Sequence, residues 1–408
     1  MRKTNLLAAL LLATSSLLAA PTTPPEEASE KQCLFQTTGH GRPYRIPALA
    51  CTRKGQLIAM TDDRYCGADI GYGRVDILAR MSKDNGKTWS PEYAVATGDG
   101  IDASPTCGYG DAAVVADRKS NAVMLLCVSA PKGGTCWTKE QRGVIAVSPD
   151  GGKTWPTPRD IKDEICGVEG SLLGPDVINY FVGSGKLHQS RYIKVGTHYR
   201  VYAALWTVKR GGARANYVIY TDNFGKNWHL LGNPGEPCVV DGDEPKCEEM
   251  PDGSVIISSR KRGGRFYNVF TYDKVNNKDF AKGSWGKQVE GCTSGDRATD
   301  GEILVLKAKR ADGAVVPLVF QSMPNEGRNK VTIWYKELTT QSTLADLAGD
   351  WTVARQISDT SSAYSTMCVQ KDGRIGFYYE EGPGTYEMVY TSLSLPYLTQ
   401  GKYTKIVK

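Results

Sequence analysis

The sequence predicts an all-β protein built from repeated units. One eight-residue phrase occurs three times, at residues 82–89, 148–155 and 221–228, each time directly after a short apolar run. Glycine (44 residues) and tyrosine (21 residues) are abundant, and apolar residues rarely recur at helical spacing. Self-similarity at a wide interval indicates repeated supersecondary units. Short β-forming runs between turn residues are typical of all-β chains.

Each copy of the phrase has the composition of a tight turn. The copies read S-K-D-N-G-K-T-W, S-P-D-G-G-K-T-W and T-D-N-F-G-K-N-W. The Asp or Asn at the third position can accept hydrogen bonds from backbone N–H groups ahead of it. The Gly tolerates a positive φ angle, and the Trp buries a large apolar surface that can hold the turn against a sheet. The phrase therefore predicts three strand–turn–strand units and not a functional site.

The first 32 residues differ in composition from the remainder. Residues 1–20 have the pattern of an export signal, with Arg2 and Lys3 before an apolar stretch and small residues up to Ala20. Residues 21–32 are rich in Pro, Thr and Glu and predict a flexible linker. The expected product is an exported protein, periplasmic or extracellular, with one domain over residues 33–408.

Cysteine usage and charge narrow the class further. Eleven Cys in an exported chain permit disulfides, and Cys127 with Cys136 and Cys238 with Cys247 are candidate pairs because each pair brackets a Gly- or Pro-containing loop. The net charge of +6 is spread along the chain, which argues against a nucleic-acid partner. No later run is long and apolar enough for a transmembrane segment, and the four dispersed His argue against a zinc site.

The repeated phrase resembles the Asp-box of the sialidases, and other stretches resemble motifs of the same family. Residues 44–49 (Y-R-I-P-A-L) look like the [FY]-R-I-P signature, which precedes the first Asp-box there as it does here. Residues 363–380 reproduce the family pattern [AG]-Y-S…D-G-x-I-G…Y-E almost position by position. The resemblance extends from about Tyr44 to Glu380. It implies a six-bladed β-propeller of four-stranded antiparallel blades and the activity of an exo-sialidase (neuraminidase), a glycoside hydrolase.

Three catalytic residues are implied by this resemblance. Arg64 ends an apolar strand, and Asp69 follows it in a glycine-rich loop, where the family carries its acid/base aspartate. Tyr364 takes the place of the nucleophile. Glu249 takes the place of the glutamate that contacts this tyrosine, because it directly precedes Met-Pro-Asp-Gly.

A second set of residues is implied to bind the substrate. Its members are Arg45, Arg64, Asp111, Arg265, Arg328 and Glu380. Three arginines (Arg45, Arg265 and Arg328) would hold the substrate carboxylate, and Glu380 would orient Arg45. The residues themselves support part of this, because an arginine flanked by an aromatic residue and Ile-Pro is desolvated and needs an anion. Arginine also binds a carboxylate in a planar, two-pronged way.

Several positions keep an ordinary structural interpretation as well. By itself Arg45 fits a strand-end salt bridge, and Arg260 and Arg262 remain alternatives to Arg265 within one basic hairpin. Trp137 is expected to pack on the sheet, with a wall for an N-acyl group as the alternative. Asp62 and Asp63 precede Arg64, so we expect strand-end or supporting roles for them.

The implied chemistry explains why these residue types are needed. Sialic acid carries a carboxylate on its anomeric carbon, which would repel a carboxylate nucleophile, and a neutral tyrosine avoids this. The tyrosine needs a base in contact, the arginines stabilise the substrate charge, and an aspartate protonates the leaving oxygen. No metal or organic cofactor is required. The expected substrates are sialylated glycoproteins, glycolipids and oligosaccharides.

Three alternatives remain open from the sequence. A trans-sialidase and a hydrolase of deaminated sialic acid would both use the same residues. A non-catalytic sialic-acid-binding propeller would have no reason to keep Asp69, Glu249 and Tyr364 together, so an active enzyme is the favoured interpretation.

Overall fold

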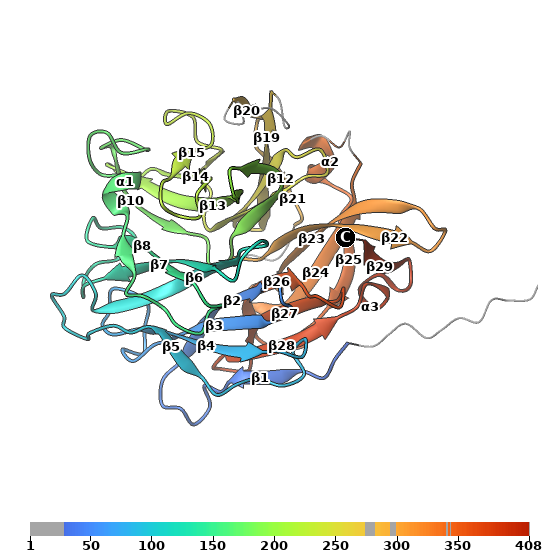
Figure 1. Cartoon of the computed structure of the whole chain (residues 1–408), viewed down its shortest axis with the longest axis horizontal. Helices are drawn as coiled ribbons and strands as arrows, with labels where there is room; N and C mark the ends of the chain where they lie inside the picture. Colours follow the sequence, from blue (N-terminus) through green and yellow to red (C-terminus); the bar gives the residue numbers. More distant parts are fainter. Residues whose placement is uncertain (1–27, 274–281, 294–298, 340–341, 343, 408) are drawn as a thin grey trace, which may run out of the picture.

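The computed structural model describes residues 28–273, 282–293, 299–339, 342 and 344–407. Six small sheets are arranged around a central axis, which confirms the predicted six-bladed β-propeller (Figure 1). Four antiparallel strands form the body of each blade, and some blades carry one or two short strands in addition. The predicted export signal, residues 1–20, lies outside the described residues, and so does most of the predicted linker.

The blades are numbered here in the order of their inner strands along the chain. Blade 1 contains β2 (Tyr44–Cys51), β3 (Leu57–Asp63), β4 (Asp76–Ser82) and β5 (Tyr93–Ala96). Blade 2 contains β6 (Gly108–Ala116), β7 (Val123–Ala130), β8 (Arg142–Ser148), β9 (Arg159–Asp160) and the parallel β11 (Gly185–Lys186). Blade 3 contains β10 (Val177–Val182), β12 (His188–Val195), β13 (His198–Lys209), β14 (Arg214–Thr221), β15 (His229–Leu230) and β16 (Val239–Val240).

The second half of the ring follows the same plan. Blade 4 contains β17 (Pro245–Glu249), β18 (Val255–Lys261), β19 (Gly264–Tyr272), β20 (Gly283–Trp285) and β21 (Val289–Gly291). Blade 5 contains β22 (Ile303–Arg310), β23 (Val315–Glu326), β24 (Asn329–Glu337), β25 (Thr352–Gln356) and β29 (Tyr403–Val407). Blade 6 contains β26 (Ser362–Val369), β27 (Ile375–Glu381), β28 (Glu387–Leu393) and β1 (Gln32–Phe35). The short helices are α1 (Lys162–Ile165), α2 (Leu344–Ala348) and α3 (Leu395–Thr399).

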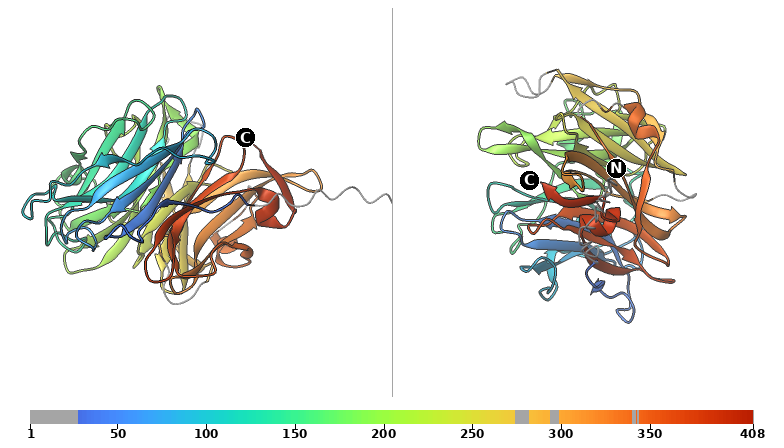
Figure 2. Two further views of the ribbon diagram at one scale, coloured as in Figure 1. Left: turned by 90° about the horizontal axis from the view of Figure 1, so that it is seen from below. Right: turned by 90° about the vertical axis from the view of Figure 1, so that its right-hand side faces the viewer.

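Blade 6 closes the ring, because its outer strand comes from the other end of the chain. β1 pairs antiparallel with β28, so residues near the two ends of the described chain share one sheet (Figures 1 and 2). The backbone N–H of Ser29 also bonds to the carbonyl of Ser392 at 2.9 Å. Residues 29–32, which the sequence assigned to the linker, are thus hydrogen-bonded to the domain.

The three repeated phrases form the predicted turns at the ends of β4, β8 and β14. In the first, Asp84 accepts hydrogen bonds from the backbone N–H and the hydroxyl of Thr88, at 2.9 and 2.6 Å. Gly86 has a φ angle of +84°, and a Cβ there would lie 2.4 Å from the Tyr390 ring of the neighbouring blade. Glycine is therefore required both by the backbone conformation and by the contact between blades.

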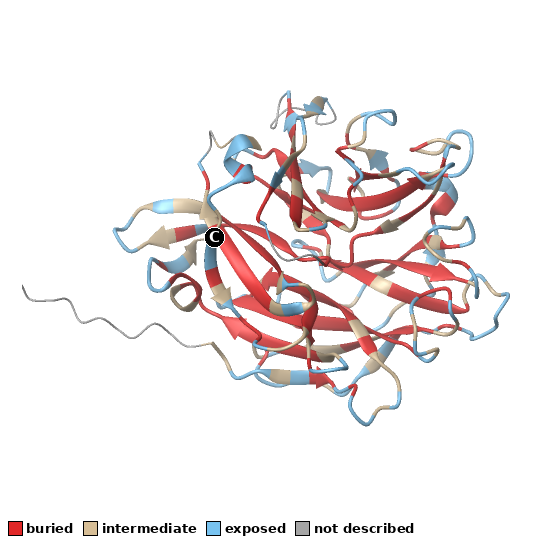
Figure 3. Cartoon of the chain, turned by 180° about the vertical axis from the view of Figure 1, so that it is seen from behind, coloured by how far each residue is buried: buried red, intermediate tan, exposed pale blue. Residues whose placement is uncertain are grey.

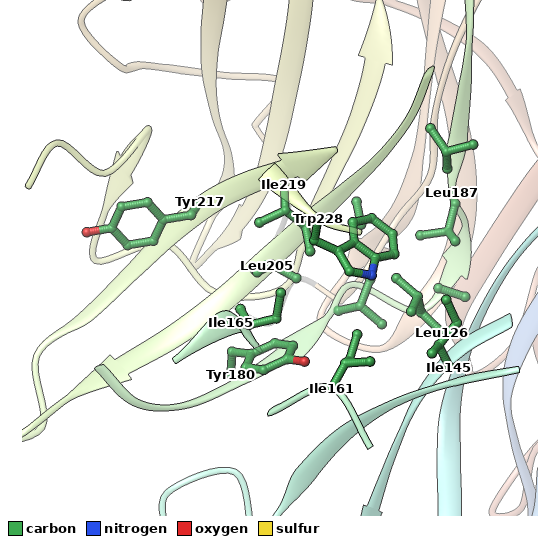
Figure 4. Packing of buried hydrophobic residues seen from close by; sticks show 14 of the residues in the cluster. Leu126, Ile145, Ile161, Ile165, Tyr180, Leu187, Leu205, Tyr217, Ile219 and Trp228 are labelled. Atoms are coloured by element: carbon green, nitrogen blue, oxygen red, sulfur yellow. The ribbon is translucent and has the colours of Figure 1, made fainter. Parts of the chain in front are cut away.

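Apolar side chains between the blades form the core. The largest cluster lies between blades 2 and 3 and surrounds Trp228 of the third repeated phrase (Figure 4). Strand residues are mostly buried, and the connecting loops carry most of the exposed surface (Figure 3). Within the described part of the chain, no helix is long and apolar enough to cross a membrane.

The two candidate disulfides are wrong. Cys127, Cys136, Cys238 and Cys247 are all free thiols. Cys127 lies in the core cluster shared by blades 1 and 2, whereas Cys136 is on a loop that lines a cavity at the propeller axis. Cys238 and Cys247 belong to one apolar cluster, where Cys238 Sγ bonds to the carbonyl of Asn216 at 3.0 Å. Cys127, Cys238 and Cys247 act as small apolar core residues, which is common for free cysteine.

Candidate active site

A cavity of about 330 Å³ lies at one end of the propeller axis. Asp69, Asp111, Glu244 and Tyr364 are among its lining residues. The inner strands β2, β6 and β26 meet at the centre of the molecule (Figure 1). Asp111 and Tyr364 lie near the N-terminal ends of such strands, and Glu244 directly precedes β17. The fold thus gathers side chains that are far apart in the sequence.

Tyr364 and Glu244 form the central pair of this cavity. The Tyr364 hydroxyl donates a short hydrogen bond to Glu244 Oε1. Burial and the adjacent Glu244 carboxylate raise the pKa of Tyr364 well above its ordinary value. Burial opposes ionisation of Glu244, but Arg260 and the Tyr364 hydroxyl outweigh it and lower the pKa of this carboxyl. The pair therefore consists of a neutral phenol and an ionised acceptor at neutral pH.

Three arginines surround the Tyr364 ring. The guanidinium carbons of Arg45 and Arg328 each lie 5.7 Å from the ring centroid. Arg260 donates to Glu244 Oε2 at 2.8 Å, and the Tyr364 hydroxyl bonds to the other oxygen of the same carboxylate. Among the described residues, no ion-pair partner within 4.0 Å is found for Arg328. A cationic group of this kind at the cavity suits a carboxylate ligand.

Glu380 organises one side of the cavity. Its carboxylate accepts hydrogen bonds from Arg45 Nε at 2.7 Å, the Ile46 backbone N–H at 2.8 Å and the Tyr364 backbone N–H at 3.1 Å. The β2 ladder slips between Arg45 and Ala48, and Ile46 takes a φ angle of +62°. A β-branched residue in this region is strained, so the buried carboxylate fixes a local backbone shape that the ladder does not.

On the second side of the cavity, several aspartate side chains lie around Arg64. Arg64 Nη2 lies 2.9 Å from Asp69 Oδ1 and 3.3 Å from Asp62 Oδ2. The Asp111 backbone N–H donates to Asp62 Oδ1 at 3.0 Å. Burial, followed by the neighbouring Asp69 and Asp62 carboxylates, raises the pKa of Asp111 well above its ordinary value. Asp69 is the exposed member, with 63% of its side chain accessible, so a ligand can reach it.

Aromatic side chains also line the cavity. The Trp137 ring packs edge-on against Trp206 of β13, with centroids 5.1 Å apart, and Trp206 stacks on Phe181 at 4.9 Å. Trp137 is 52% exposed and lines the cavity. It therefore both packs on the sheet and forms a wall, so the two interpretations of this residue describe one position.

The comparisons with known proteins agree with this geometry. A model described as the BNR repeat-like domain matches residues 55–377. The chain belongs to the BNR repeat-like domain family. Its curated relatives identify it further as a member of the bacterial-type sialidase family.

Individual relatives show how far the likeness extends. A sialidase of Micromonospora viridifaciens is 28% identical over 356 residues, which cover 84% of this chain and 50% of the relative. The structure of a Hadza microbial sialidase has a TM-score of 0.69 at 21% identity, over 88% of this chain and 66% of that one. The intramolecular trans-sialidase from Ruminococcus gnavus, solved with oseltamivir carboxylate, has a TM-score of 0.67 at 16% identity, over 90% and 98%.

The identities and coverages determine which conclusions the family likeness supports. At such identities the two solved structures establish a shared fold. The chain spans about half the length of the curated sialidases of Micromonospora viridifaciens (50%) and Bacteroides fragilis (42%).

The structure does not bring Glu249 to the tyrosine, so the expected contact between Glu249 and Tyr364 is wrong. Glu249 is the last residue of β17, whereas Glu244 directly precedes the first residue of that strand. Five residue steps along the strand place their backbones ~16 Å apart at the usual rise per residue. Glu249 is fully buried, accepts hydrogen bonds from the Ser190 hydroxyl and the Arg191 backbone N–H, and faces His188. It lines a different cavity of about 600 Å³ at the opposite end of β17.

Arg265 is also outside the cavity that contains Tyr364. Its side chain is fully buried, and it donates to the hydroxyl and carbonyl of Ser258 and to the Thr299 carbonyl. Arg260 lies directly opposite Arg265 in the β18–β19 ladder. Arg260 contacts Glu244. Of the arginines in the basic hairpin, Arg260, which the sequence left open as an alternative to Arg265, is therefore the one that fits the site.

The position of a residue within its strand could have identified both Glu244 and Arg260 from the sequence. The cavity residues of the inner strands lie at the N-terminal ends of those strands, which singles out Glu244 before β17. The supporting residues Asp62, Arg260 and Glu380 are each the penultimate residue of a second strand, namely β3, β18 and β27. The motif match instead used the turn after β17, which lies at the wrong end of the strand.

In the described part of the chain, no group of three or more His, Cys, Asp or Glu is arranged to hold a metal ion.

Proposed function

We propose that this protein is an exo-sialidase that hydrolyses terminal α-linked sialic acid with retention of configuration, using Tyr364 as the nucleophile. One observation carries the proposal: the Tyr364 hydroxyl bonds to Glu244 in a cavity where Arg45, Arg260 and Arg328 surround the ring. A tyrosine paired with a carboxylate base and ringed by cations suits an anomeric centre that carries its own carboxylate.

In the first half-reaction Glu244 accepts the phenolic proton while the Tyr364 oxygen attacks the anomeric carbon. Asp69 gives a proton to the glycosidic oxygen, so the aglycone leaves as a neutral alcohol. The product is a sugar joined to the tyrosine through oxygen. The lowered pKa of Glu244 keeps it ionised and ready to accept the proton.

The second half-reaction reverses these transfers. Asp69, now ionised, removes a proton from water, and the resulting oxygen attacks the anomeric carbon from the face that the aglycone left. The bond to Tyr364 breaks, and the phenol recovers its proton from Glu244. Two inversions give net retention, as in other retaining glycosidases.

The three arginines act on the substrate carboxylate throughout. Arg45 is held by Glu380, and Arg260 is shared with Glu244. Arg328 has its positive charge free to pair with the carboxylate. Preorganised cations of this kind stabilise charge without reorganisation during the reaction. Asp111 would face the sugar beside Asp69, which Arg64 holds, and Trp137 would provide an apolar wall suited to an acyl substituent.

The substrates would be sialylated glycoproteins, glycolipids or oligosaccharides, because these carry terminal sialic acid. We also propose that residues 1–20 direct export. N-terminal sequencing of the protein recovered outside the cytoplasm tests this, and an intact Met1 in that fraction would contradict it.

Fluorescence release from methylumbelliferyl α-N-acetylneuraminide tests the activity. We expect turnover by the wild type and none by Tyr364→Phe of equal stability, because the phenol oxygen makes the covalent bond. NMR of the first-formed product distinguishes the routes: the α anomer of free sialic acid indicates retaining hydrolysis, and transfer to an acceptor or to a hydroxyl of the sugar itself indicates a trans-sialidase. Sialic acid binding without turnover would contradict the proposal and favour a binding propeller.

A further inference from the structure

The backbone around the cavity contains the same irregularity in two neighbouring blades. In β2 the ladder slips between Arg45 and Ala48, and Ile46 has a φ angle of +62°. In β6 the ladder slips between Gly110 and Ala113, and Asp111 has a φ angle of +56°. Both are β-bulges near the N-terminal end of an inner strand. A bulge re-aims a side chain and leaves a backbone N–H without its ladder partner.

A buried carboxylate from the preceding blade satisfies each of these N–H groups. Glu380, the penultimate residue of the second strand of blade 6, accepts from Ile46 of blade 1 at 2.8 Å. Asp62, the penultimate residue of the second strand of blade 1, accepts from Asp111 of blade 2 at 3.0 Å. Each carboxylate also holds an arginine that contacts a cavity residue: Glu380 holds Arg45 beside Tyr364, and Asp62 contacts Arg64, the partner of Asp69, at 3.3 Å. The two carboxylates thus occupy equivalent places, one blade apart.

We propose that Asp62 is a positioning residue of the reaction, which fixes Asp111 through its backbone N–H and Asp69 through Arg64. This inference rests on the proposed function. Asp62 is fully buried, and it is not among the residues that line the cavity. Its Oδ1 accepts from Asp111 of β6 and its Oδ2 contacts Arg64 in the loop after β3, which pairs with Asp69, so one side chain bears on two cavity residues. Loss of such support moves reacting groups by fractions of an ångström to 1 Å, which costs up to about 10²-fold in rate.

The surroundings of Asp62 explain why a carboxylate is needed there. Arg64, Asp69 and the Asp111 backbone face it, and Cys127 of β7 packs nearby. A Cβ on Gly110 would lie 2.8 Å from Asp62 Oδ2, so glycine is required where the carboxylate approaches β6. Burial raises the pKa of Asp62 to about 7, against the opposing effect of Arg64. The fold therefore keeps an acid at a position where it is costly, as expected of a group with a role beyond packing.

Asp63 is a matched control on the same strand. Its side chain points to the opposite face, as successive strand residues do, and it is almost as buried as Asp62. It pairs with Arg42 at 2.6 Å and with His40 at 3.2 Å. Asp63→Asn therefore removes a buried charge and its ion pairs from the same strand and leaves the cavity contacts in place.

The experiment compares Asp62→Ala, Asp62→Asn and Asp63→Asn on two substrates, sialyllactose and the methylumbelliferyl sialoside. Asp62→Ala is expected to lower kcat/KM on sialyllactose by about 10²-fold, with a smaller loss on the aryl substrate. The aryl group leaves without full protonation, so it depends less on the position of Asp69. Asp62→Asn keeps an oxygen acceptor for the Asp111 N–H and is expected to recover part of the loss. Asp63→Asn is expected to keep the wild-type ratio between the substrates.

Crystal structures of the Asp62 variants give a second readout that does not depend on turnover. We expect Asp111 to leave its left-handed conformation and Arg64 to move in Asp62→Ala, and Asp111 to stay in place in Asp62→Asn. Unmoved Asp111 and Arg64 in the alanine variant would overturn the proposal, as would a substrate ratio equal to that of Asp63→Asn. Failure of the wild type on both substrates would contradict the proposed function alone, because the structures still decide the role of Asp62.

Discussion

Tyr364 and Glu244 are 120 residues apart in the sequence and hydrogen-bonded in the fold. The tyrosine comes from the inner strand of blade 6 and the glutamate from the start of blade 4, so the pair spans the propeller axis. Arg260 bonds to the second oxygen of Glu244 and keeps it ionised. An ionised acceptor on a neutral phenol is the arrangement that a tyrosine nucleophile requires.

Replacing Glu244 tests which glutamate serves as the base. Glu244→Gln is expected to lower kcat by 10²- to 10⁴-fold, the usual contribution of a general base. Glu249→Gln is the matched control at the other end of the same strand, and its expected effect is a loss of about 1–3 kcal/mol in unfolding free energy, with near-normal turnover per folded molecule. Steady-state kinetics and urea unfolding of both variants measure this. Inactivity of folded Glu249→Gln with an active Glu244→Gln would reverse the assignment.

Arg260 is expected to contribute to binding and to the reaction. Arg260→Ala removes a cation that contacts Glu244, so we expect kcat/KM to fall by about 10²- to 10³-fold, as for loss of one preorganised donor. Arg262→Ala, an exposed residue of the same hairpin, is the control and should stay within twofold of the wild type, about 0.4 kcal/mol. Equal losses in both variants would indicate a general effect of hairpin charge.

Glu380 is expected to be important for stability as well as for the site. Glu380→Ala leaves Arg45 and the backbone N–H groups of Ile46 and Tyr364 without their acceptor. Removing one partner of a buried ion pair costs about 3–5 kcal/mol, which urea unfolding measures. Glu381→Ala on the same strand removes a pair with the half-exposed Lys31 and one hydrogen bond from the Tyr379 hydroxyl, and should cost less, about 1–2 kcal/mol. A similar cost for both variants would show that the buried contacts of Glu380 are unimportant.

The repeated turns predict a pH dependence of stability. Hydrogen bonds from Thr88 lower the pKa of Asp84 from 3.8 to about 2 in the folded protein. The folded state therefore releases this proton more readily than the unfolded state, so the stabilisation is complete above about pH 4 and is lost as the pH falls towards 2.

Asp84→Asn isolates this effect. Asparagine occupies the same place in the third turn, where Asn223 accepts from the Asn227 backbone N–H at 2.9 Å. We expect the difference in unfolding free energy between wild type and Asp84→Asn to shrink between pH 4 and pH 2. Chemical denaturation at several pH values measures it, and a difference that stays constant over this range would contradict the assignment.

The sequence by itself determined the repeated units, the strand–turn–strand character of the phrase and the family. It did so because an Asp or Asn, a Gly and a Trp at fixed spacing are required locally, by one turn and its contact with the preceding blade. It also identified Asp69, Tyr364, Arg45, Arg328 and Glu380, which the fold brings to one cavity or its immediate support.

Only the tertiary structure decided between Glu244 and Glu249 and between Arg260 and Arg265. Both members of each choice lie on the same strand or on directly paired strands, so their local sequence is equally suitable. Which end of β17 faces Tyr364, and which strand of the β18–β19 hairpin brings its arginine to Glu244, depends on how six blades close into a ring. That closure joins β1 to β28 across the whole chain, and no local pattern contains it.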